Sequence, residues 1–176
     1  MSAGRMSIDD VVGLVESLGG VLTLRPGPGD GSPEAAWGDL FFHYAPDGVV
    51  PRTQPFATVV TKDLPGEPAA GLDRPGAFRL NIAASAADHS RWTGRAPGEP
   101  VPGDAGPAVP DTVLAHPVYG HLGWVAVVDP GPRTAGAVGD LLRAAHARAR
   151  ARRERRLSVQ PRSPELPPSG ERSSEM

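Results

Sequence analysis

The sequence predicts an α+β domain in which a single, mostly antiparallel sheet of about five strands carries the N- and C-terminal helices on one face. Helical patterns of apolar residues open and close the chain, and short segments rich in β-branched and aromatic residues lie between them. The connections 47–54 and 64–76 are too short for a crossover helix, so the strands they join are expected to be antiparallel neighbours. The two long helices would then cover the apolar face of the sheet.

The first predicted helix spans 7–18 and is followed by Gly19 and Gly20, a common way for a helix to end. Ser7 and Asp10 match a capping box, in which the two side chains accept hydrogen bonds from backbone N–H groups of the first turn. The apolar residues of this segment fall on one face at helical spacing: Ile8, Val11, Val12, Val15 and Leu18. We expect that face to pack on the sheet.

Strands are predicted at 21–25, 38–44, 55–63, 77–83 and 123–129. In the segment AFRLNIA the apolar residues Phe78, Leu80 and Ile82 alternate with two polar residues, which predicts that the apolar three face the core. The polar two are Arg79 and Asn81. Base rates favour an ordinary solvated face for them, and a shared polar pocket is the alternative.

Two more helices complete the predicted fold. A short one is expected at 86–92, because Ser85 begins a second capping-box pattern, and the last one begins near Thr134. The domain is predicted to cover 1–156. Within it, the Gly- and Pro-rich stretch 94–110 is expected to be a flexible insert.

Composition excludes several classes of protein. The chain of 176 residues has no Cys, which excludes disulfide scaffolds, thiolate zinc sites, iron–sulfur clusters and a Cys nucleophile. The formal net charge of −2 excludes a globally basic nucleic-acid coat. No apolar run is long enough to span a membrane and no secretory leader opens the chain, so a cytoplasmic protein is expected.

Charge is distributed unevenly along the chain. Residues 1–142 carry 9 basic and 16 acidic groups, whereas 143–176 carry 9 basic and 4 acidic groups. Much of the basic charge lies in the arginine run 148–156, which we interpret first as a solvated helix end. A weak nucleic-acid patch and a docking tail are the alternatives. The lack of interleaved aromatic residues makes nucleic acid an unlikely partner.

No established catalytic or phosphate-binding motif is present. The glycine-rich stretches precede no Gly-Lys-Ser/Thr, no Ser has the flanking glycines of a nucleophile elbow, and there is no His-Glu-x-x-His. His116 and His121 in the segment HPVYGH could meet His43 at one ion, but their spacing matches no standard metal site. We therefore expect no metal and no cofactor.

The remaining candidates are polar or aromatic residues at strand ends and in loops. Lys62 and Asp63 close a predicted strand, where they form either a surface ion pair or part of an anion site. Tyr119 and Trp124 are expected to pack in the core, although each has a polar end that could line a pocket.

Four sequence blocks occur in a specific order: FFHY at 41–44, PFATVVTKD at 55–63, LDRPGAFRLNI at 72–82 and HPVYGHLGW at 116–124. In this combination they resemble domain-of-unknown-function family 6194, over about 8–150. The resemblance implies a single compact α+β domain and no assigned activity, so no catalytic residue can be carried over. The layout is also similar to the MmcQ/YjbR-type fold, whose members are often labelled DNA-binding.

Because these blocks contain many polar residues, they favour a shared polar pocket more than the base rates for a solvated strand face do. The expected function is binding of a small polar or anionic ligand or of a protein partner, without a cofactor. One alternative is a small enzyme with His116 or Asp63 as acid or base. In that enzyme Lys62 or Arg79 would hold an anion. A second alternative is weak DNA binding through the arginine-rich helix end. The candidate ligand-binding residues are Lys62, Asp63, Arg74, Arg79, Asn81, His116, Tyr119 and Trp124.

The tail 157–176 is rich in Pro, Ser, Glu and Arg and is expected to be disordered, because it has too few apolar side chains to offset the entropy of ordering. Truncation after Arg156 should therefore leave the melting temperature unchanged in differential scanning calorimetry. A drop of several degrees would show that the tail packs on the domain.

Overall fold

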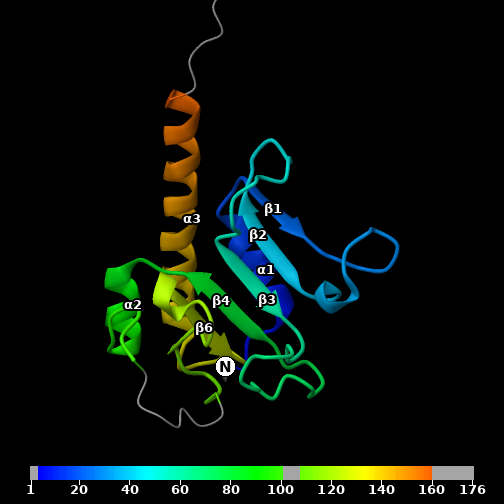
Figure 1. Ribbon diagram of the computed structural model, residues 1–176, viewed down its shortest axis with the longest axis vertical. Helices are drawn as coiled ribbons and strands as arrows, with labels where there is room; N and C mark the ends of the chain where they lie inside the picture. Colours follow the sequence, from blue (N-terminus) through cyan, green and yellow to red (C-terminus); the bar gives the residue numbers. More distant parts are fainter. Residues whose placement is uncertain (1–3, 101–107, 160–176) are drawn as a thin grey trace, which may run out of the picture.

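The computed structural model describes residues 4–100 and 108–159, and it has an α+β architecture built on a single antiparallel sheet (Figure 1). The predicted fold class is confirmed. In chain order the elements are α1 (Ile8–Ser17), β1 (Val21–Leu24), the 3-10 helix η1 (Glu34–Ala36), β2 (Leu40–Tyr44), β3 (Ala57–Val60), β4 (Arg79–Ala83), α2 (Ala86–Thr93), β5 (Leu114–Ala115), the 3-10 helix η2 (Gly120–Leu122), β6 (Trp124–Val128) and α3 (Ala135–Val159).

The strands lie in the order β1-β2-β3-β4-β6-β5, and every neighbouring pair is antiparallel. Strand β4 therefore lies inside the sheet, where Leu80 is opposite Val59 on one side and Val127 on the other. The sheet has six strands in the described residues, not about five. The additional strand, β5, has only two residues, which is too short for the alternation that identifies a strand in a sequence.

Helices α1 and α3 cover one face of the sheet and contact each other (Figure 1). This face carries the main apolar core, in which Phe42, Leu80 and Ile82 are fully buried. From the helices, Val15 and Leu142 are among the fully buried side chains that meet them. The amphipathic patterns thus identified correctly which side of each long helix packs on the sheet.

In the part of the chain that the structure describes, neighbouring serines cap α1 and α2 as expected, and a residue distant in sequence caps α3. The predicted capping box of Ser7 and Asp10 is present on α1, and the Ser85 side chain accepts from the Asp88 backbone N–H on α2. At the start of α3, the carboxylate of Asp111 accepts hydrogen bonds from the backbone N–H groups of Gly131, Arg133 and Thr134. Asp111 is far from α3 in the sequence, so local pattern alone cannot reveal this cap.

The second face of the sheet is buried as well, which contradicts the expected solvated face. Arg79 is 4% exposed and Asn81 is 2% exposed. The connection between β3 and β4 folds over this face, where Leu72 and Ala77 join Val128 in a second, smaller apolar cluster. Alternating polar residues in a strand pattern predict a solvated face, but here the connection supplies a polar partner, Glu67, in place of water.

Two expected boundaries can be compared with the structure only in part. Helix α3 runs to Val159, beyond the domain boundary predicted at 156, and Val159 is 78% exposed. The rest of the predicted disordered tail lies outside the described residues. The described parts of the insert 94–110 contain no helix or strand, and its residues 101–107 also lie outside them. Among the described helices, none combines the length and the apolar character needed to cross a bilayer.

Because Leu80 is fully buried between the sheet and the helices, Leu80→Ala should lower the free energy of unfolding by about 2–5 kcal/mol. Leu122, which is 65% exposed, provides the control. Leu122→Ala should change stability by less than about 0.5 kcal/mol. Urea denaturation followed by circular dichroism measures both. Equal losses for the two variants would contradict the burial of Leu80.

Candidate functional site

A cavity of about 680 Å³ lies against the second face of the sheet. Its walls come from β4, β5 and β6, from the connection that follows β3, and from the residues around the end of α2. Most of the lining is apolar: Pro68, Ala69, Ala70, Ala108, Val113, Leu114, Ala115, Pro117, Ala126 and Val128. The polar side chains in the lining come from Arg79, Thr93, Arg95 and His116. An apolar chamber with a few polar groups is typical of a small-molecule site.

Arg79 enters the cavity lining from β4 with its charge already compensated. Its Nε donates to Asn81 Oδ1 at 2.9 Å, and its Nη2 donates to Glu67 Oε2 at 2.9 Å. Asn81 Nδ2 in turn donates to Thr58 Oγ1 at 3.0 Å on the neighbouring strand. The remaining nitrogen, Nη1, makes no hydrogen bond to any residue that the structure describes. Because Arg79 lines the cavity, Nη1 is the donor of this side chain to consider for a bound molecule.

His116 follows β5 and has a fixed tautomer. Its Nδ1 accepts hydrogen bonds from the backbone N–H groups of Val118 and Tyr119, both at 3.0 Å, so the ring proton of the neutral form lies on Nε2. Burial, together with the positive charge of Arg79, lowers the pKa of His116 to about 4. At neutral pH the ring is therefore an uncharged Nε2–H donor.

Tyr119 and Asn81 lie next to these two groups. The Tyr119 ring centroid is 5.0 Å from that of His116, and Tyr119 itself is 49% exposed, which contradicts the expected core packing. Asn81 orients the Arg79 guanidinium through the hydrogen bond already described. The structure thus brings together Arg79, Asn81, His116 and Tyr119.

The other candidate residues lie elsewhere. Lys62 donates to the backbone carbonyl of Trp37, and its Nζ is 3.9 Å from Asp39 Oδ1. Arg74 forms an ion pair with Asp129 at 2.8 Å. Trp124 is partly buried at the start of β6 and is absent from the cavity lining.

Asp63 also has a local role. Its carboxylate accepts hydrogen bonds from the backbone N–H groups of Ala70 and Leu72, at 2.8 and 3.3 Å, and so shapes the connection between β3 and β4. Asp63 does not line the cavity. Since His116 Nδ1 is occupied and Nε2 is protonated, neither proposed acid or base is placed to accept a proton from a molecule in the cavity.

Sequence reasoning missed two charged residues of this region. Glu67 is the carboxylate partner of buried Arg79, and Arg95 contributes to the cavity lining from the segment that was predicted to be only a flexible insert. Glu67 lies in the connection 64–76, which the sequence analysis treats only as too short for a crossover helix. A buried Arg on a strand is itself a signal, because it requires an acidic partner nearby.

Comparison with known proteins agrees with the resemblance of the four blocks. The model of a family of unknown function, DUF6194, matches residues 6–158. The chain belongs to the DUF6194 family. No curated protein and no solved structure was found to match it, so the likeness to the MmcQ/YjbR-type fold stays a prediction. The matched region includes every residue of the cavity lining in this DUF6194 protein.

The lowered pKa of His116 gives a test by titration. Its imidazole signals in long-range 1H–15N NMR should show the Nε2–H tautomer at neutral pH and should titrate near pH 4. As pH falls, His116 is protonated in the unfolded chain near pH 6.5, before it is protonated in the folded protein near pH 4. His116 therefore contributes to a loss of folding stability from about pH 6.5 downward. His116→Gln should make the melting temperature less dependent on pH in this range. A titration midpoint above 6 would contradict the described environment.

Proposed function

We propose that this DUF6194 protein binds a small organic molecule with an apolar body and one terminal carboxylate in the cavity over the second face of the sheet. The observation that carries the proposal is the cavity itself. Its volume of about 680 Å³ lies within the usual range of ligand sites, about 300–1,000 Å³.

The apolar part of the ligand is inferred from the walls. Leu114, Ala126 and Val128 present side chains from three positions on β5 and β6, and Val113 adds another from the preceding loop. Burial of apolar ligand surface against such walls contributes about 25 cal/mol for each Å² removed from water. A ligand that is polar throughout would lose its hydration without gaining hydrogen bonds along these walls.

The carboxylate is inferred from the balance of charge. Two guanidinium groups, those of Arg79 and Arg95, line the cavity. Among the described residues, Glu67 is the carboxylate that pairs with Arg79, and no acidic side chain pairs with Arg95. One positive charge therefore remains for the ligand. Arg79 Nη1 and His116 Nε2–H are the donors proposed to hold its oxygens.

Binding is tested by a thermal-shift screen of straight-chain and aromatic monocarboxylates, each paired with its primary amide. A carboxylate present at a hundred times its Kd should stabilise the fold by about 2.7 kcal/mol, and the uncharged amide of the same shape should stabilise it less. Ala126→Leu adds bulk to the cavity wall and should abolish the shift. Isothermal titration calorimetry then gives the Kd of the best compound.

Lys62→Gln is the control for surface charge, because it removes a positive charge from a residue outside the cavity lining. It should leave the carboxylate affinity unchanged. The proposal fails if no carboxylate raises the melting temperature above its amide. It also fails if Lys62→Gln reduces the shift and Ala126→Leu leaves it intact, since the anions would then bind by surface charge alone.

A further inference from the structure

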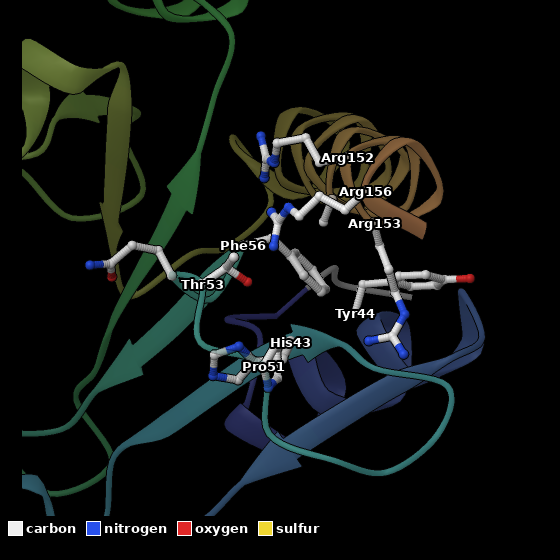
Figure 2. Close-up of a pocket in the computed structure, with 10 residues that line it drawn as sticks. His43, Tyr44, Pro51, Thr53, Phe56, Arg152, Arg153 and Arg156 are labelled. Atoms are coloured by element: carbon white, nitrogen blue, oxygen red, sulfur yellow. The ribbon is translucent and has the colours of Figure 1, made fainter. Parts of the chain in front are cut away.

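A second, smaller pocket lies on another part of the molecule, between strand β2 and the C-terminal half of α3. Its volume is about 50 Å³. Arg152, Arg153 and Arg156 of the helix belong to its lining. In Figure 2 their side chains project from the helix, and His43 and Pro51 lie on the side away from it. Its lining also includes Tyr44, Thr53, Gln54, Phe56 and Ala149. No residue is shared with the cavity described above.

The pocket holds positive charge that the protein compensates only in part. Arg153 pairs with Asp47 at 2.8 Å, but Arg152 and Arg156 form no ion pair with a residue that the structure describes. Among residues 4–100 and 108–159, no acidic side chain belongs to the lining. Arg152 and Arg156 are exposed, and two guanidinium groups without an acidic partner beside one pocket give it a positive potential that favours an anion.

The spacing of the arginines on α3 adds to this argument. Arg148, Arg152 and Arg156 are each four residues apart, so they lie along one face of the helix. The pKa of Arg148 is lowered, first by burial and then by the positive charge of Arg152. Like charges at this spacing destabilise a helix. A bound anion would reduce that repulsion between Arg152 and Arg156, the two arginines of this row that line the pocket.

His43 provides an independent observation on the opposite wall. It is 6% exposed, and its Nδ1 is buried without a hydrogen-bond partner among the described residues. Burial lowers the pKa of His43, so the ring is neutral at physiological pH. A buried polar atom without a partner is rare, and in His43 it belongs to a side chain that lines the pocket.

We propose that this pocket binds a phosphate group of a small phosphomonoester or of inorganic phosphate. The volume of about 50 Å³ suits a single tetrahedral anion. Three guanidinium groups, the His43 ring and the side chains of Thr53 and Gln54 offer more donors than the two oxygens of a carboxylate can accept. A dianion with several acceptor oxygens uses them better, and its charge matches that of Arg152 and Arg156.

Isothermal titration calorimetry with sodium phosphate, at ionic strength held constant with sodium chloride, tests the site. Phosphate should bind the full chain saturably, and Arg156→Gln should weaken binding about tenfold. Arg155→Gln removes the same charge from an exposed neighbour that does not line the pocket, and it should leave the affinity unchanged. In NMR, phosphate should shift the imidazole signals of His43 and leave those of His116 unchanged.

Three results would overturn the proposal. The first is no saturable binding at phosphate concentrations up to about 10 mM. The second is equal weakening by the Arg156 and Arg155 variants, which would show binding to general surface charge. The third is tight binding of a DNA duplex that both variants weaken alike, without binding of phosphate alone, which would assign the arginines to a nucleic-acid surface.

Discussion

Burial of the Arg79 guanidinium is the constraint on which the second face of the sheet depends. A charged side chain that is 4% exposed is stable only when its hydrogen-bonding groups meet partners. Glu67 supplies the opposite charge and Asn81 supplies a second acceptor. Because Glu67 belongs to the connection between β3 and β4, the ion pair holds this connection over the sheet. The neighbouring residues 68–70 then form one wall of the cavity.

The same charge determines what the cavity can do chemically. Burial, and then the charge of Arg79, oppose protonation of His116, and two backbone N–H groups fix its proton on Nε2. The cavity therefore offers N–H donors at its polar end and no free base from these two side chains. Such an arrangement holds an oxygen atom in place. With its proton on Nε2, His116 offers no proton acceptor there, which bears only on the interpretation of this residue as a base.

Elements with a clear period could be predicted from the sequence, and elements that depend on distant contacts could not. The face of α1 and the inward side of β4 follow from spacing alone, and Ser7 and Ser85 identify where two helices begin. Strand β5 is too short to show a period, and the cap that Asp111 provides for α3 comes from another part of the chain. Both depend on tertiary structure.

The candidate site shows the same division. Arg79, Asn81 and His116 could be singled out as polar residues in the blocks that carry the family resemblance, and the structure places them together. Lys62 and Arg74 have the same kind of side chain, but Trp37 and Asp129 engage them elsewhere. Which polar residues meet depends on partners that are distant in sequence. The apolar walls of the cavity gave no signal of their own, because apolar strand residues usually indicate core packing.

The contact between α1 and α3 joins the first and the last helix of the described chain. It can therefore form only after the last helix has been synthesised. Strands β1 to β6 leave the ribosome before residues 135–159 do. Until then, the sheet face that carries Phe42, Leu80 and Ile82 has only α1 to cover it. The nascent domain thus exposes apolar surface at a stage when chaperone binding and aggregation compete with folding.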